Sequence, residues 1–166
     1  MLIRRLVASD AAAFQALRLA ALRDSPSAFS SSYEQECDTA HATIENNLTQ
    51  RNLFGAFDGQ ALAGMVGVGR DTAPKLSHKG YIRAMYVAPQ HRGKGVARQL
   101  FEHALAFVAA MDGIRQVTLV VTAGNAPAIH LYASLGFVVY GREPQALFAD
   151  GVLHDNVLMV YEVVAA

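Results

Sequence analysis

Residues 87–105 read VAPQHRGKGVARQLFEHAL, and they place a glycine-rich turn between the end of a strand and the start of an amphipathic helix. Gly93 and Gly95 let an anion approach the backbone closely, because glycine carries no side chain. Arg92 and Lys94 add positive charge. The first amides of a helix lack partners within it, and the helix macrodipole places partial positive charge at the same end. The stretch therefore predicts a phosphate-binding turn, with an ordinary strand–helix turn as the alternative.

Two familiar phosphate motifs do not fit this turn. A P-loop requires serine or threonine directly after its lysine, but Lys94 is followed by Gly95. A dinucleotide-binding fingerprint requires a third glycine three residues after the second, and Arg98 stands at that place. These departures argue against both ATP and a dinucleotide as the source of the phosphate.

The composition is that of a globular protein. Hydrophobic residues make up 52% of the 166 residues, and 14 basic side chains balance 14 acidic ones. We expect one domain spanning residues 1–166, and the lack of a basic excess argues against nucleic-acid binding. The single cysteine, Cys37, rules out an internal disulfide and fits a reducing compartment. Since no apolar run approaches the ~18 residues of a membrane helix and no signal peptide is evident, we expect a cytoplasmic protein without membrane contact.

Apolar periodicity and turn residues predict alternating helices and strands. Asp58-Gly59 and Asp150-Gly151 each indicate a hairpin. Asn125 is suited to cap a short helix that Gly136 ends. The remaining expected elements are strands at 2–7, 80–88 and 115–122, helices at 11–24 and 40–50, and a helix from 96. This order indicates an α/β (mixed α+β) fold.

Two segments resemble the motifs of a known family. QHRGKG, residues 90–95, is similar to the Q/R-x-x-G-x-G/A signature of the GNAT superfamily of N-acetyltransferases. NAPAIHLYASLGF, residues 125–137, resembles the N-x-x-A-x-x-L-Y-x-x-x-G-F segment of the same family. The order of elements is also similar from Leu2 to Val163. The resemblance implies a central, mostly antiparallel twisted sheet of about seven strands flanked by about four helices.

The resemblance further implies that acetyl-CoA is the co-substrate. Its pyrophosphate is expected on the turn and the helix start, mainly through backbone amides, at Gln90, Arg92, Gly93, Lys94, Gly95, Val96 and Ala97. The backbone of the preceding strand, at Met85 and Val87, is expected to pair with the pantetheine arm. Asn125 is expected to contact the cofactor arm as well as capping its helix.

Tyr132 is the residue that the resemblance assigns to catalysis. Acyl transfer from a thioester expels a thiolate, and a phenol near the sulfur can donate a proton to it. The phenol is suited to this role because its pKa of about 10 lies only slightly above the about 8.5 of a free thiol. The alternative is a core tyrosine satisfied by one hydrogen bond.

A general base for the amine is not evident. Many members of the family place a glutamate on the strand before the glycine turn, whereas GYIRAMYV, residues 80–87, carries Arg83 and no carboxylate. Glu34 and His78 are candidates from other elements, and a chain of water molecules is equally compatible. The histidines and the lone cysteine show no ligand spacing, so no metal site is expected.

The acceptor is expected between two polar loops, because the resemblance places the acceptor pocket there. The first loop supplies the substrate-binding candidates Phe29, Ser31, Tyr33 and Glu34, and the second is the C-terminal hairpin. Their mixed polarity suits a small amine or an amino acid, which predicts an acetyl-CoA-dependent N-acetyltransferase acting by direct attack in a ternary complex. The alternatives are a protein or peptide N-acetyltransferase, a transferase of longer acyl groups and a non-catalytic CoA-binding sensor. The sequence leaves the oligomeric state open, with a homodimer as one alternative.

Overall fold

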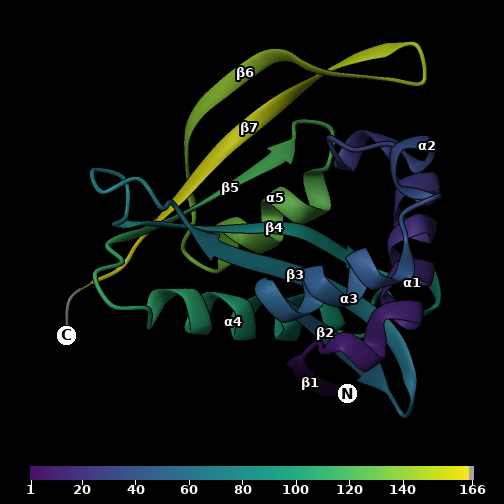
Figure 1. Cartoon of the computed structure of the whole chain (residues 1–166). Coiled ribbons are helices and arrows are strands. Elements are labelled where there is room, and N and C mark those ends of the chain that lie inside the picture. Colours follow the sequence, from purple (N-terminus) through teal and green to yellow (C-terminus); the bar gives the residue numbers. More distant parts are fainter. Residues whose placement is uncertain (165–166) are drawn as a thin grey trace.

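A seven-stranded sheet, in the order β1-β2-β3-β4-β5-β7-β6, organises the computed structural model, which describes residues 1–164 (Figure 1). Among these residues only β4 and β5 pair in parallel, and all other neighbouring strands are antiparallel. The prediction of a mostly antiparallel sheet of about seven strands is therefore confirmed. The strands are β1 (Leu2–Arg5), β2 (Asn52–Asp58), β3 (Ala61–Arg70), β4 (Lys79–Val87), β5 (Gln116–Thr122), β6 (Val138–Ala149) and β7 (Val152–Glu162).

The described residues form five α-helices rather than the expected four or so. They are α1 (Ala11–Asp24), α2 (Tyr33–Glu36), α3 (His41–Gln50), α4 (Val96–Ala109) and α5 (Ala126–Ser134), with 3-10 turns at Ala8–Asp10, Pro26–Ala28 and Pro89–His91. The additional helix is α2, a single turn in a stretch that was expected to be a loop. None of these helices, within residues 1–164, combines the length and apolar character that a membrane crossing requires.

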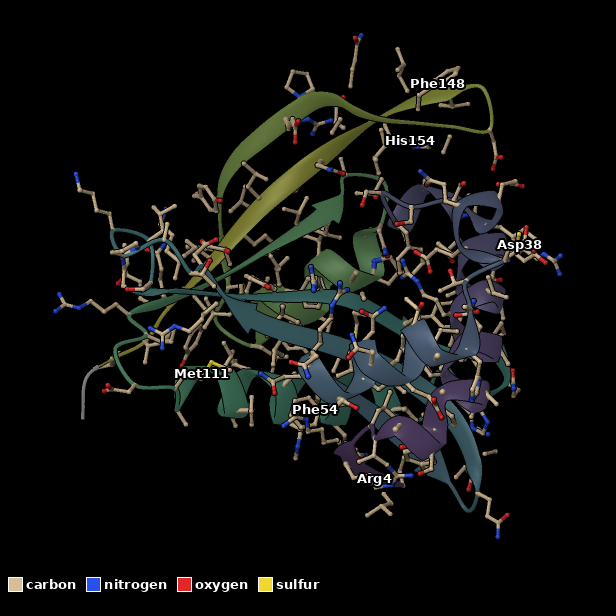
Figure 2. The ribbon with its side chains drawn as sticks, viewed as in Figure 1. Arg4, Asp38, Phe54, Met111, Phe148 and His154 are labelled. Atoms are coloured by element: carbon tan, nitrogen blue, oxygen red, sulfur yellow. The ribbon has the colours of Figure 1, made fainter. Side chains whose placement is uncertain are left out.

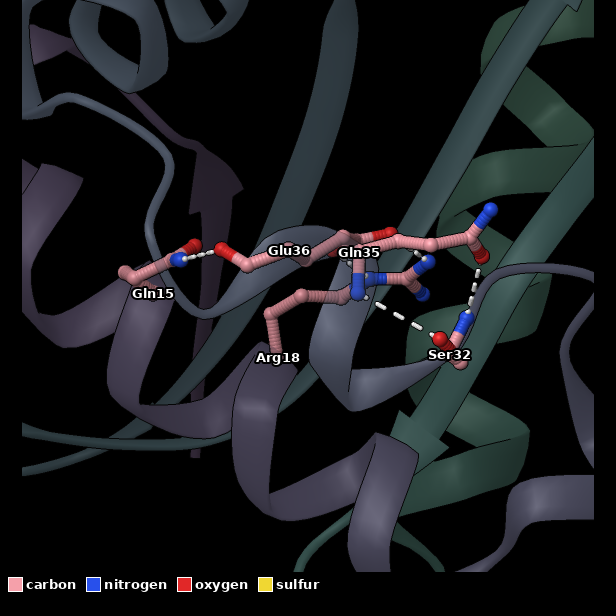
Figure 3. Close-up of polar contacts among 5 residues, drawn as sticks. All are labelled: Gln15, Arg18, Ser32, Gln35 and Glu36. Atoms are coloured by element: carbon pink, nitrogen blue, oxygen red, sulfur yellow. Dashed lines mark hydrogen bonds and ion pairs between the residues drawn. The ribbon is translucent and has the colours of Figure 1, made fainter.

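A capping box explains α2. The Ser32 amide donates to Gln35 Oε1 at 2.8 Å, and the Gln35 amide donates to Ser32 Oγ at 3.3 Å (Figure 3). The two residues thereby satisfy amides that a helix start would leave without partners. Because the segment has no apolar periodicity, sequence reasoning treated it as a loop although the Ser-x-x-Gln spacing was present.

Both predicted hairpin turns are confirmed. Gly59 joins β2 to β3 with φ of 59°. Asp150 and Gly151 join β6 to β7 with φ of 51° and 74°, the left-handed conformation that favours glycine and that aspartate tolerates. Asn125 caps α5, since its Oδ1 accepts from the Ala128 amide at 3.3 Å.

Helices cover both faces of the sheet. On one face α4 contributes Val96, Leu100, Ala104 and Val108, all at most 2% exposed, and α5 packs beside it. On the opposite face α1 and α3 bury two smaller apolar clusters. The apolar stripe at helical spacing that the sequence shows therefore fixes which side of α4 meets the sheet.

The pairing between β4 and β5 ends after three residues. Lys79, Gly80 and Tyr81 pair with residues 116–118, and from there β4 pairs only with β3 while β5 pairs only with β7. A bulge follows on β4, where Ala84 has a φ of 54°. The two strands therefore diverge toward their carboxyl ends and leave a gap inside the sheet.

Candidate active site

The glycine turn between β4 and α4 is held in a left-handed conformation. Gly93 has a φ of 72° and Gly95 a φ of 76°. A Cβ atom at residue 93 would meet nothing within 4 Å, and one at residue 95 would meet only Gln99 Nε2, at 3.8 Å. Conformation rather than crowding therefore requires glycine here, and the space above the turn is open.

Backbone amides line this open space. From Gly93 to Arg98, no backbone amide donates a hydrogen bond to any of residues 1–164. They lie at the N-terminus of α4, a helix of 14 residues whose dipole places partial positive charge there. Lys94, whose side chain is exposed on the same turn, adds a full charge. The turn can hold the oxygens of a diphosphate.

Arg92 connects this turn to α1. Its Nε donates to the Val87 carbonyl at 2.9 Å and its Nη2 donates to Asp24 Oδ2 at 2.5 Å. The Tyr86 hydroxyl donates to the same Asp24 oxygen at 3.1 Å. The Arg92 amide is also occupied, by the Pro89 carbonyl at 3.2 Å. Contact between Arg92 and phosphate stays a prediction, because these bonds use both the amide and the guanidinium to position the turn.

The gap between β4 and β5 contains a narrow cavity of about 60 Å³. Three of the predicted site residues line it, Met85 from β4, Asn125 from the start of α5 and Tyr132 from its second turn. The backbone of Val87 also faces the gap. The Ala88 amide bonds to the Ala63 carbonyl at 2.8 Å, and alternate residues of an antiparallel strand turn away from the partner strand.

Tyr132 is buried, with 7% of its surface exposed. Its ring lies 4.6 Å from that of Phe101, and Phe137 packs against the same pair. Burial raises the pKa of Tyr132 to about 12, since an apolar surrounding disfavours the phenolate. Among residues 1–164 no group forms a hydrogen bond with its hydroxyl, which is therefore available to a ligand in the narrow cavity.

The other predicted cofactor residues lie along the turn and the start of α4. Gln90 is exposed in the 3-10 turn that precedes Arg92. Val96 is buried in the core and Ala97 is half-buried, so these two residues offer their amides rather than their side chains. Their contact with a cofactor stays a prediction.

A second cavity, of about 690 Å³, adjoins the narrow one. Its walls come from α1, from α3, from the segment between these helices that contains α2, and from β2, β4, β5, β6 and β7. The two cavities share the lining residues Ala28, Ile82, Arg83, Ala84, Leu119, Val120 and Thr122. A ligand in the narrow cavity can therefore meet a ligand in the larger one at the point where β4 and β5 separate.

Two of the four predicted substrate-binding residues lie on the larger cavity. Phe29 and Ser31 line it, whereas Tyr33 and Glu34 do not. Glu36 does instead, because α2 turns this side chain inward and leaves Glu34 exposed. Arg23 covers the ring of Tyr33, with its guanidinium carbon 3.8 Å from the ring centre.

An ion pair that sequence reasoning did not single out forms part of the wall. Arg18 Nε and Nη2 donate to the two carboxylate oxygens of Glu36 at 2.9 and 2.8 Å, and Gln15 Nε2 donates to the Glu36 carbonyl at 2.9 Å (Figure 3). The hydrogen bonds from Arg18 lower the pKa of Glu36 despite its partial burial. The signal in the sequence was an arginine within the apolar side of α1, which requires a buried partner.

The charged side chains that line the larger cavity are three arginines, Arg18, Arg51 and Arg83, and one carboxylate, Glu36. No histidine of the described residues lines either cavity. Glu36 is a weak base because its pKa is lowered, and His78 lines neither cavity. Within residues 1–164, no cluster of three His, Cys, Asp or Glu side chains is arranged to hold a metal ion.

Comparison with known proteins relates the chain to acetyltransferases. Residues 16–137 match the model of the Acetyltransferase (GNAT) family. The chain is 36% identical over 69 residues to a spermidine N(1)-acetyltransferase of Vibrio cholerae, which covers 42% of this chain. It is 31% identical over 141 residues to a mycothiol acetyltransferase of Brachybacterium faecium, which covers 82% of this chain. In both cases the chain spans only 40% of the relative's length.

Solved structures share the fold. An acetyltransferase of the GNAT family from Streptococcus pneumoniae superposes with a TM-score of 0.89 at 22% identity, over 98% of this chain and 99% of the other. The acetyltransferase yncA from Salmonella typhimurium, described as putative and solved with its cofactor acetyl-CoA, gives 0.81 at 22% identity over 100% and 95%. At this level of identity the likeness establishes the fold.

The positive φ of Gly95 predicts the effect of a substitution. Gly95→Ala places a Cβ in the left-handed region, which costs about 1 kcal/mol of folding free energy. Because the strain distorts amides at the helix start, we expect acetyl-CoA to bind about tenfold more weakly, as measured by isothermal titration calorimetry. Gly113→Ala is the matched control, because Gly113 has a φ of 75° at the other end of α4. Equal affinity losses in the two variants would contradict the assignment of the turn.

The contact between Arg92 and Asp24 predicts a smaller effect. Asp24→Asn removes the charge that orients Arg92, and since the pair is partly exposed we expect at most about fivefold weaker acetyl-CoA binding with an unchanged kcat. Hydrogen bonds from Arg92 lower the pKa of Asp24, so its stabilisation is present above the ordinary carboxyl pKa and is lost as the pH falls through the lowered value.

The melting temperatures of wild type and D24N should therefore differ by a constant amount between about pH 6 and 8 and converge in acid. D112N serves as the control, because no hydrogen bond within residues 1–164 involves the Asp112 carboxylate. A D24N protein that binds acetyl-CoA as wild type does would remove the positioning role of this contact.

Proposed function

Since its residues 16–137 match the family model, the chain belongs to the GNAT acetyltransferase family, and we propose that it transfers the acetyl group of acetyl-CoA to an amine of a small molecule. The observation that carries the proposal is the junction of two cavities at the divergence of β4 and β5. Tyr132 lines the narrow cavity, and the larger cavity has room for a second substrate. We propose that residues 1–166 act as one acyl-CoA N-acyltransferase domain.

The chain has donors and space that fit acetyl-CoA. The free amides from Gly93 to Arg98 match a pyrophosphate, and the unpaired edge of β4 around Met85 and Val87 matches an amide-bearing arm. Asn125 lies beside the same gap. Acetyl-CoA supplies the acetyl group as a reactive thioester, and the residues of the chain bind and orient it.

Tyr132 is the proposed proton donor to the leaving thiolate. Its hydroxyl has no hydrogen-bond partner among residues 1–164, and Tyr132 lines the cavity that would hold the sulfur. A pKa of about 12 keeps the phenol protonated throughout the neutral and mildly alkaline range, which a donor requires. The close packing with Phe101 and Phe137 fixes the ring, so little freedom is lost when the hydroxyl is used.

The amine is proposed to reach its reactive form without a protein base. Glu36 is the single carboxylate that lines the larger cavity, and the hydrogen bonds from Arg18 stabilise its charged form. The amine therefore loses its proton to water before or during binding. Its own pKa then sets the fraction that can attack the thioester.

A small acceptor is favoured by the size of the larger cavity. Its volume of about 690 Å³ lies within the range of about 300–1,000 Å³ that is usual for small-molecule sites. Two related acetyltransferases are named for spermidine and for mycothiol, both small molecules. These likenesses support a small-molecule acceptor over a protein.

Removal of the Tyr132 hydroxyl tests the proton donor. Tyr132→Phe should lower kcat by about 10²-fold with little change in the KM for acetyl-CoA, since the donor acts on the leaving group. Release of the CoA thiol measured with a thiol-reactive dye provides the readout. Tyr140→Phe is the control, because Tyr140 is 57% exposed and lines neither cavity. Unchanged turnover of Y132F across the pH range would exclude the role.

The pH profile tests the absence of a protein base. With acceptors of different amine pKa, kcat/KM should rise with pH up to the pKa of each amine. It should show no decline at any pH up to about 10, because Tyr132 stays protonated there. The measurement is a set of pH–rate profiles for at least three amines. A rising limb with one pKa common to all amines would instead indicate a base on the protein.

A further inference from the structure

The larger cavity carries an excess of positive charge that the fold does not use. Three arginines and one carboxylate line it, and that carboxylate is fully engaged by Arg18. Building on the proposed function, we infer that the acceptor carries an acidic group, a carboxylate or a phosphate, on the same small molecule as its amine, and that Arg83 binds this group.

Arg83 is the best placed of the three. It is exposed on β4, directly before the bulge residue Ala84, and it lines both cavities. Its guanidinium carbon lies 5.2 Å from the ring centre of Tyr81, and no carboxylate in residues 1–164 forms an ion pair with it. The positive charge therefore lies at the junction of the cavities, beside the place where the amine must meet the thioester.

The position of Arg83 limits the shape of the acceptor. An arginine side chain presents five donors in a planar fork that matches a carboxylate or a phosphate in two-point contact. Since this fork borders the junction of the cavities, the acidic group and the amine must lie within a few bonds of each other. Amino acids and short aminoalkyl phosphates have this arrangement.

The other two arginines add to the effect. Arg51 is exposed at the rim of the cavity, and its side chain makes no ion pair within residues 1–164. Arg18 is largely buried, and its Nη1 has no hydrogen-bond partner although Glu36 holds its other two nitrogens. Arg18 Nη1 therefore lacks an acceptor and Arg51 lacks a counter-charge, and an anionic ligand would supply both.

The same charges disfavour a cationic acceptor. A polyamine would bring additional positive charge against Arg51 and Arg83, with Glu36 already paired to Arg18. The relative named for spermidine aligns with only 42% of this chain, so its acceptor does not transfer. The charge balance of the cavity, rather than overall likeness, decides between the two kinds of amine.

Matched pairs of acceptors provide the test. Each amino acid is compared with its primary amide, and O-phosphoethanolamine is compared with ethanolamine, with spermidine included as a cationic acceptor. Thiol release gives kcat/KM, expressed per concentration of unprotonated amine because amides have a lower amine pKa than acids. For at least one acidic acceptor, kcat/KM should be about tenfold higher than for its uncharged partner, mainly because KM is lower. The carboxylate and phosphate pairs show which acid is used.

Variants assign the effect to Arg83. Arg83→Gln should reduce the ratio of kcat/KM for the acidic acceptor to kcat/KM for the uncharged acceptor toward one. Arg83→Lys should restore part of this ratio, because lysine returns the charge without the planar fork of donors. Arg23→Gln is the control, since Arg23 also lies on a ring, that of Tyr33, but lines neither cavity. Melting curves of all variants confirm that the comparison is made on folded protein.

A second readout separates this inference from the proposed function. In the presence of CoA, the acidic acceptor should raise the melting temperature of wild type more than its amide does, and R83Q should lose that difference. Turnover of amides or spermidine at least as fast as acids would overturn the inference and leave the acetyltransferase intact. A melting temperature raised by the acidic acceptor, without turnover of any amine, would support the binding site and overturn the proposed activity. No preference in either readout would overturn the inference.

Discussion

The site depends on the early end of one strand pairing. β4 and β5 pair over three residues, and beyond them β4 pairs only with β3 and β5 only with β7. A parallel pair normally continues along the sheet and has no free backbone groups in its interior. Here the divergence exposes the β4 edge around Met85 and Val87, and it places Tyr132 from α5 against the opening. Without the divergence the sheet would be closed where both cavities meet.

The candidate site has two positively charged regions, the glycine turn and the larger cavity, and they are built in different ways. At the glycine turn the charge is mostly partial and comes from amides and the dipole of α4, so it requires a particular backbone conformation at Gly93 and Gly95. In the larger cavity the charge is carried by guanidinium groups on strands and helices. Arg92 anchors the turn, since its guanidinium donates to Asp24 of α1 and to the carbonyl of Val87 in β4. Arg92 thus positions the backbone of the turn, whereas Arg51 and Arg83 line the larger cavity.

Sequence reasoning predicted the features that depend on local chemistry. The hairpin turns, the apolar stripe of α4 and the cap at Asn125 each follow from residues close together in the chain, and the structure has all of them. The inward orientation of Glu36 could not be predicted in the same way, because it depends on contact with Arg18, 18 residues earlier in the chain. The exposure of apolar residues in the β6–β7 hairpin could not be predicted either, because it depends on the tertiary arrangement. Phe148, for example, is 74% exposed (Figure 2).

The proposed proton donor and the proposed acceptor site have different electrostatic surroundings. Burial alone raises the pKa of Tyr132, and neither Arg83 nor Arg18 contributes to the shift. A cation in close contact would stabilise the phenolate and lower the pKa, which would make the hydroxyl less able to remain protonated. The raised pKa of the Tyr132 phenol thus follows from its burial, and the proposed binding of an acidic acceptor would not require a cation beside the phenol. On this proposal, one scaffold would keep the same acyl chemistry while the charge of the larger cavity selects the amine.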